Sequence, residues 1–208
     1  MDRIILASGS PRRQQLLAQV GIPCEVIVSG ADENIDGPPD YQVRELALRK
    51  AQAVQKMIKS EVTKDVFGNN VQKPSFYDNA IIIAADTLVH IDDKILGKPT
   101  NPDDAFQMLK SLSGCTHTVY TGVALIKSGE AMSFIDTAKV HFRNLTDDEI
   151  LAYIATGEPF DKAGSYGVQD RGALLVDRIE GDYFTIVGLP VAKVAVALRD
   201  MGYEVWGK

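Results

Sequence analysis

The stretch Ser8-Gly9-Ser10-Pro11-Arg12-Arg13 lies where an apolar run ends and a helical pattern begins, and it decides the fold class. Residues 4–7 are continuously apolar and predict a buried strand, while apolar residues recur at helical spacing over residues 16–20. Pro11 suits the first turn of a helix, where its missing N–H costs nothing. A buried strand that leads directly into a helix indicates an α/β protein.

The start of this helix has the chemistry of an anion site. Free backbone N–H groups and the positive end of the helix dipole meet there. The hydroxyls of Ser8 and Ser10 and the guanidinium groups of Arg12 and Arg13 add further donors. The loop is therefore suited to a phosphate. The alternative is a plain capped helix with two solvated arginines, and the motif alone does not separate the two.

The composition is that of an ordinary globular protein: 208 residues, 45% hydrophobic and 24% charged. This length allows one substantial core, or two lobes that share one. A net charge of −6 argues against binding to nucleic acid polymers or anionic membranes. The sequence shows no signal peptide and no apolar run of roughly 18 residues. With Cys24 and Cys115 far apart and read as reduced thiols, we expect a cytoplasmic protein.

Residues 43–58 predict a strong amphipathic helix, and Lys50 falls within its apolar stripe. In one interpretation the Lys50 side chain snorkels off the edge of that stripe. In the other, its ammonium points into a cleft and meets an anion. Residues 59–79 then break the pattern and predict a long surface loop.

A second polar site follows the apolar run of residues 80–85, which predicts a central strand. Asp86 and Thr87 come at the end of this run, where α/β proteins bind ligands. Asp92-Asp93 lies between two apolar runs and predicts a two-residue hairpin turn. Counting outward from that turn places Asp86 and Lys98 on neighbouring strands. The alternative for such a pair is a plain salt bridge.

The rest of the chain has clear local patterns. Asn101-Pro102-Asp103-Asp104 predicts a helix start, with a proline and two acids in the first turn. Thr146 has capping-box spacing before another helical pattern. Four runs predict strands paired as two hairpins, namely residues 118–126 with 132–142 and residues 174–179 with 183–187. Gly188-Leu189-Pro190 then opens a closing helix.

The glycine-rich stretch 161–169, Asp161-Lys162-Ala163-Gly164-Ser165-Tyr166-Gly167-Val168-Gln169, is a weak signal alone. Together with earlier motifs in a fixed order, it resembles the Maf family of nucleoside triphosphate pyrophosphatases. The resemblance covers residues 4–198. The earlier motifs are Ser8-Gly9-Ser10-Pro11-Arg12-Arg13, Glu33, Leu46-Ala47-Leu48-Arg49-Lys50-Ala51, Ala84-Ala85-Asp86-Thr87 and Gly97-Lys98-Pro99.

The resemblance implies a metal-dependent hydrolase that cleaves a nucleoside triphosphate between its α and β phosphates. The implied structure is an elongated Maf/inosine-triphosphatase-like α/β fold: one domain over residues 1–208, with a curved mixed sheet, two lobes flanking a cleft, and a homodimeric assembly. Family members acting on dTTP and UTP carry a glutamine like Gln169, whereas relatives acting on 7-methyl-GTP carry a glutamate there. Arg12, Thr87 and Gln169 match positions tied to substrate choice, and Asp86 matches the proton acceptor.

The residue chemistry agrees with this resemblance. A triphosphate needs cations, and Arg12, Arg13, Lys50 and Lys98 supply four. Glu33 and Asp86 are the carboxylates expected to hold a divalent Mg²⁺ or Mn²⁺. Asp86, with Lys98, would then serve catalysis by activating water and stabilising charge. The donor and acceptor of the Gln169 amide match the O4 and N3–H edge of uracil or thymine. The expected substrate-binding set is Ser8, Ser10, Arg12, Arg13, Lys50, Thr87, Lys162 and Gln169.

Two departures from the family pattern accompany the match. Gln169 is followed by Asp170-Arg171, where the family usually has a glycine, and the insertion at residues 59–79 is longer than usual. Two other functions stay open: a nucleotide-binding regulatory protein without turnover, and the same hydrolysis on 7-methyl-GTP or a modified nucleotide.

Overall fold

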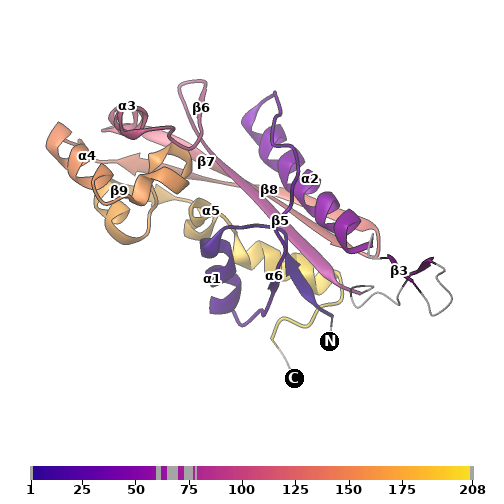
Figure 1. Cartoon of the computed structure of the whole chain (residues 1–208). Helices are drawn as coiled ribbons and strands as arrows, with labels where there is room; N and C mark the ends of the chain where they lie inside the picture. The colour runs from indigo at the N-terminus through magenta and orange to yellow at the C-terminus, as the bar shows by residue number, and fades with distance from the viewer. Residues whose placement is uncertain (1, 60–61, 65–69, 73–76, 78, 207–208) are drawn as a thin grey trace.

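A computed structural model describes residues 2–59, 62–64, 70–72, 77 and 79–206, and its centre is a seven-stranded mixed sheet (Figure 1). The strand order is β2-β1-β5-β7-β8-β9, with β6 paired to β5. Strand β1 runs parallel to β2 and β5, and the other pairs are antiparallel. The strands are β1 (Ile4–Leu6), β2 (Glu25–Val26), β5 (Ile81–Ile91), β6 (Lys94–Leu96), β7 (Thr116–Lys127), β8 (Glu130–Phe142) and β9 (Val176–Glu180).

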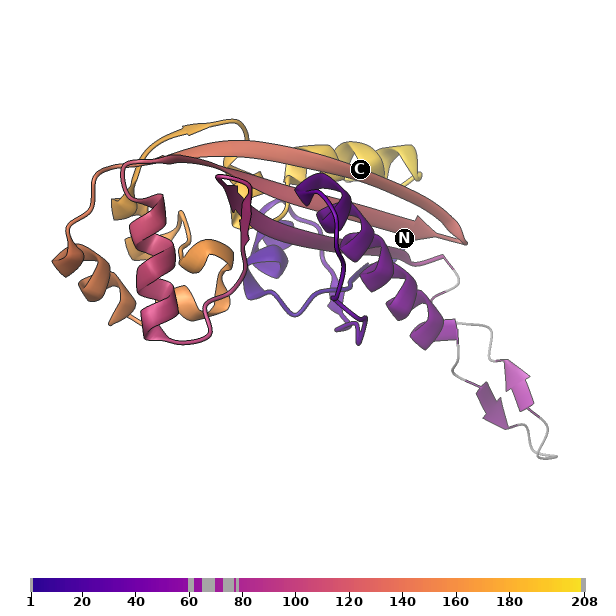
Figure 2. The ribbon, with the colours of Figure 1, turned by 90° about the horizontal axis from the view of Figure 1, so that it is seen from above.

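Helices cover both faces of the sheet, which explains why β1 and the first half of β5 are apolar throughout. Figure 2 shows α2 (Pro39–Lys59) on one face and α6 (Val191–Asp200) on the other. Helices α1 (Pro11–Gln19) and α5 (Tyr183–Val187) lie on the same side as α6, where their apolar residues join its core. Alternate residues of β5 therefore belong to two different cores.

The end of the sheet near β6 is covered by α3 (Pro102–Leu112), α4 (Asp147–Ile154) and three short 3₁₀ helices. The two predicted helix starts are confirmed: the Asn101 side chain accepts from the Asp104 N–H, and Thr146 forms the predicted capping box with Glu149. The 3₁₀ helices are η1 (Glu158–Asp161), η2 (Ala163–Ser165) and η3 (Asp170–Leu175).

The hairpin at Asp92-Asp93 is confirmed, because Ile91 pairs with Lys94 and both turn residues have positive φ, at 46° and 60°. The extension of that register to Lys98 is wrong. Strand β6 stops at Leu96, and the next residue turns away to another partner: the Gly97 carbonyl accepts from the Gly164 N–H at 3.0 Å. The predicted register would place Lys98 opposite Thr87, but Lys98 lies beyond the end of β6 and is not paired with Thr87.

Two other predictions need correction. Residues 183–187 form helix α5 rather than the second strand of a hairpin. Asp182 caps this helix by accepting from the Phe184 N–H, and Gly188 ends it at φ 115°, so the two ends override the β-favouring composition. Within the predicted loop 59–79, β3 (Val62–Lys64) and β4 (Asn70–Gln72) pair antiparallel in a sheet of their own. The rest of that prediction falls on residues 60–61, 65–69, 73–76 and 78, outside the described residues.

None of the helices in the described part of the chain is long and apolar enough to cross a membrane.

Candidate active site

A cleft of about 640 Å³ opens at one edge of β5, a size typical of small-molecule sites. On this edge β1 pairs with residues 81–83 and β6 with residues 89–91, so the stretch between them has no strand partner among the described residues. The eleven residues expected from the sequence all line this cleft. They are Ser8, Ser10, Arg12, Arg13, Glu33, Lys50, Asp86, Thr87, Lys98, Lys162 and Gln169.

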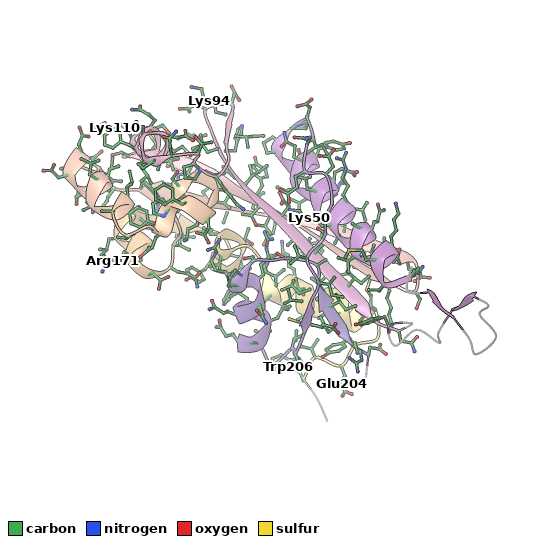
Figure 3. The ribbon with its side chains drawn as sticks, viewed as in Figure 1. Lys50, Lys94, Lys110, Arg171, Glu204 and Trp206 are labelled. Carbon is green, nitrogen blue, oxygen red and sulfur yellow. The ribbon has the colours of Figure 1, made fainter. Side chains whose placement is uncertain are left out.

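Lys50 forms the centre of one wall. Its Nζ lies 2.6 Å from Asp86 Oδ1 and 2.9 Å from Glu33 Oε1. The Lys50 side chain is only 11% exposed and that of Asp86 16%, whereas Glu33 is 66% exposed. Figure 3 shows Lys50 on the side of α2 that faces β5. The ammonium therefore points into the cleft, and the snorkelling interpretation is wrong.

The close approach of α2 to the sheet is what allows this contact. Gly122 of β7 is paired with Asp86, and a Cβ on Gly122 would lie 2.3 Å from the Val43 carbonyl oxygen. Only a glycine lets the α2 backbone pack directly on the strand.

Arg13 is held by three hydrogen bonds on the opposite face of β5. Its Nε donates to the Gly188 carbonyl at 2.8 Å, Nη1 to Ser8 Oγ at 3.0 Å and Nη2 to Thr87 Oγ1 at 3.1 Å. Burial lowers the pKa of Arg13, and the charge of Asp86 opposes that shift. Three of its five N–H donors are used, so one on each terminal nitrogen is left for a ligand.

Ser8 is buried and presents a donor to the cleft. Its oxygen accepts from Arg13 and, at 3.3 Å, from the Ser10 N–H, which uses both lone pairs. The Ser10 side chain does not cap α1, and the first turn of α1 contains no acidic residue. The alternative of a plain capped helix with two solvated arginines is therefore wrong, and the local charge favours an anion.

A second wall comes from η1 and the glycine-rich stretch. Arg12 Nη1 and Lys162 Nζ both contact the carboxylate of Asp161, at 2.7 Å each. Burial raises the pKa of Asp161, but hydrogen bonds from Lys162 and Arg12 outweigh burial and hold it below its ordinary value. Asp161 was missed as a site residue, although it adjoins Lys162 in a motif that carried the resemblance. An anion near these cations must compete with Asp161.

Lys98 and Gln169 are two polar side chains of the cleft that are not tied to other protein groups. Lys98 is exposed and Gln169 half-buried, and neither has a hydrogen-bond or ion-pair partner within the described part of the chain. Asp170 has φ 50°, in the left-handed region, which gives a physical reason for the family's usual glycine there. Arg171 is exposed at the outer margin (Figure 3), and neither it nor Asp170 lines the cleft.

A buried histidine that sequence reasoning missed, His117, contacts Tyr166 of the glycine-rich stretch. His117 Nε2 lies 2.6 Å from the Tyr166 hydroxyl, and both rings pack against Phe142. Burial lowers the pKa of His117 to about 4, so its ring is neutral at pH 7. Only its position on a largely apolar face of strand β7 could have suggested this role.

A divalent cation fits one side of the cleft. Glu33 and Asp86 both contact Lys50 Nζ, so two carboxylates lie close together beside an anion-binding loop. No three His, Cys, Asp or Glu side chains gather as a metal site within the described residues. Two carboxylate oxygens fit an Mg²⁺ or Mn²⁺ that takes its other ligands from phosphate and water.

Comparison with known proteins identifies the family. The family described as "Maf-like protein" matches residues 3–201. This chain belongs to the Maf family. It is 45% identical over 212 residues, the whole of both chains, to a Moorella thermoacetica protein named dTTP/UTP pyrophosphatase. A Bacillus cereus (strain ATCC 14579) protein of the same name is 44% identical over 207 residues, which cover 99% of this chain and 98% of that protein.

The structural comparison supports the Maf fold. The solved Ham1 protein of Staphylococcus aureus superposes with a TM-score of 0.51 over 96% of this chain and 99% of its own. At 11% identity this likeness concerns the fold alone. The fold class expected from the sequence, an α/β protein with a mixed sheet, is confirmed.

Proposed function

We propose that this Maf protein hydrolyses dTTP and UTP to the nucleoside monophosphate and pyrophosphate. The observation that carries the proposal is the convergence of cations, hydroxyl donors and the Asp86 carboxylate in one cleft. The names of the two relatives, which match the whole length of this chain, support the same substrates.

The α1 side of the cleft binds the triphosphate. The Ser8 hydroxyl and two N–H groups of Arg13 remain available there, beside the N-terminus of α1. Lys98 adds an ammonium that has no partner among the described residues. The base lies toward Gln169, whose amide offers a donor and an acceptor to the O4 and N3–H edge of uracil or thymine. Arg12 and Thr87 complete the selection of substrate.

Asp86 accepts the proton of the attacking water. One of its oxygens, Oδ1, is bound by Lys50, which leaves Oδ2 for the water. Lys98 stabilises the negative charge that develops on the leaving phosphates. Asp86 and Glu33 would hold a Mg²⁺ or Mn²⁺, which neutralises phosphate charge when bound.

The proposal includes the setting of the enzyme. It acts in the cytoplasm as a homodimer of single-domain subunits, with two lobes flanking each cleft, and it has neither a nucleic acid polymer nor a membrane as a partner. The charge of −6 supports the last part, because such polyanionic surfaces repel an acidic protein.

The test is a substrate panel with product identification. Purified protein with Mg²⁺ or Mn²⁺ is offered dTTP, UTP, CTP, modified uridine triphosphates and 7-methyl-GTP. We expect pyrophosphate and monophosphate from dTTP and UTP at the highest kcat/KM. Binding of dTTP without release of pyrophosphate would instead identify a regulatory protein, and a clear preference for 7-methyl-GTP would overturn the base assignment.

Gln169→Glu is the matched variant for the base. It should lower kcat/KM most for dTTP and UTP, because a carboxylate cannot donate to O4. An equal loss on every nucleotide would mean that Gln169 does not contact the base.

A further inference from the structure

A chain of hydrogen bonds leads from the cleft into the core of the protein. Arg13 Nη2 donates to Thr87 Oγ1, which lies 2.9 Å from Thr121 Oγ1 on the neighbouring strand β7. Thr121 Oγ1 in turn donates to the Thr185 carbonyl of α5 at 2.8 Å. Thr121 and Thr185 are fully buried, and the Thr185 hydroxyl is itself fixed by donating to Asp136 Oδ2 at 2.7 Å.

Which hydroxyl donates in each of these hydrogen bonds follows from the atoms at the buried end of the series. The Thr185 carbonyl can only accept, and the two N–H groups that follow α5 both donate to the Phe184 carbonyl instead. A hydroxyl has one hydrogen, and that of Thr121 is therefore committed to Thr185. The contact between the two threonine hydroxyls then requires Thr87 to be the donor. A buried carbonyl without a hydrogen-bond partner is costly, which keeps this arrangement in place.

Thr87 consequently faces the cleft as an acceptor only. Its hydrogen points to Thr121, one lone pair accepts from Arg13, and the remaining lone pair has no partner among the described residues. Ser8 has the opposite polarity, since both its lone pairs accept and its hydrogen is free. A phosphate oxygen suits Ser8 and is repelled by Thr87, so the two hydroxyls bound by one arginine select different parts of a nucleotide.

We propose that Thr121 is a positioning residue for substrate selection. By accepting the Thr87 hydrogen it leaves Thr87 as an acceptor toward the cleft, so Thr87 binds an N–H or O–H donor of the nucleoside part of the substrate. This inference rests on the proposed function. Two groups of a pyrimidine nucleotide can be this donor: a hydroxyl of the sugar, or the imide N–H of uracil or thymine if Gln169 contacts O4 alone. Cytosine has an acceptor nitrogen where uracil has its imide N–H, and a dideoxynucleotide has no sugar hydroxyl to donate.

Thr121→Val tests the inference, because valine keeps the shape of threonine and frees the Thr87 hydrogen to turn toward the cleft. The kcat/KM of wild type and variant is measured with UTP, CTP, dTTP and 2′,3′-dideoxy-TTP. We expect the ratio of UTP to CTP, or of dTTP to its dideoxy analogue, to fall about tenfold, the effect of one lost hydrogen bond. A change in the first ratio identifies the imide N–H as the donor, and a change in the second identifies the sugar hydroxyl. Equal loss on all four substrates, or no change, would overturn the inference.

Two controls separate selection from damage to the fold. Thr121→Ser keeps the hydroxyl and should keep both ratios, and Thr121→Ala carries the same expectation as the valine variant if the latter does not fold. In a Thr87→Val background, Thr121→Val should change neither ratio, because Thr121 acts only through Thr87. A change in that background refutes the inference. A wild type that hydrolyses neither UTP nor dTTP refutes the proposed function instead, and the inference falls with it.

Discussion

Replacing Asp86 with Asn removes the charge of this side chain and keeps its shape. Lys50, whose side chain is 11% exposed, then has Glu33 as its remaining carboxylate partner. Removing one partner of a fully buried ion pair costs about 3–5 kcal/mol. Here the asparagine oxygen still accepts from Lys50 and a second carboxylate remains, so we expect a loss of about 1.5 kcal/mol in the free energy of unfolding. That loss lowers the Tm of a chain of this size by about 3–6 °C.

Glu33→Gln is the matched control, because Glu33 contacts the same ammonium but is 66% exposed. Exposed pairs contribute about 0–1 kcal/mol, so its Tm should fall by no more than about 2–4 °C, less than that of Asp86→Asn. Pyrophosphate release should fall at least about 100-fold in Asp86→Asn, the usual effect of losing a general base. The reasoning is refuted if Glu33→Gln destabilises the protein as much as Asp86→Asn, or if Asp86→Asn keeps near-normal turnover.

Three other changes have defined outcomes. Lys98→Ala should lower kcat/KM by a factor equivalent to about 2–4 kcal/mol. Its Tm should not change, since this exposed ammonium has no protein partner among the described residues. An unchanged kcat/KM would remove Lys98 from the reaction. At position 170, where Asp170 has φ 50°, Gly should give a protein about 1 kcal/mol more stable than Ala in denaturant unfolding, and the reverse order would exclude backbone strain. Hydrogen bonds from Arg143 and Thr146 hold the pKa of Glu149 at about 2, below its ordinary 4.5, so its stabilisation is complete above pH 4.5 and is lost as the pH falls toward 2. Thermal unfolding should show Glu149→Gln below wild type at pH 6, with most of that difference lost by pH 2, and a pH-independent difference would contradict this.

The elements that were predicted correctly depend on residues adjacent in sequence. The hairpin turn at Asp92-Asp93 and the capping box at Thr146 are each complete within a few residues, so their geometry follows from local chemistry. Residues 183–187 show the limit of such reasoning. Their side chains favour a strand, but the Asp182 cap and the burial of one face of α5 favour a helix, and burial depends on the rest of the fold.

The same limit applies to the candidate site. Residues such as Lys50 and Asp86 could be found from sequence because each departs from an apolar pattern on its own element. Asp161 does not depart from a pattern in this way, since its partner Arg12 is 149 positions away and a carboxylate in a polar loop is unremarkable without it. Thr121 is a further case, because a threonine within a strand is ordinary until its partners are known.

Arg13 acquires a different role once its partners are known. An arginine at the start of a helix suggests a phosphate ligand, but three of its donors bind Gly188, Ser8 and Thr87. These bonds tie α1 to β5 and to the end of α5, and they use lone pairs of the two hydroxyls that flank the guanidinium. Because Ser8 is left with a hydrogen and Thr87 with a lone pair, a ligand on this wall meets a donor at one side of Arg13 and an acceptor at the other. Such a wall distinguishes the two ends of a nucleotide, which a cluster of solvated arginines could not do.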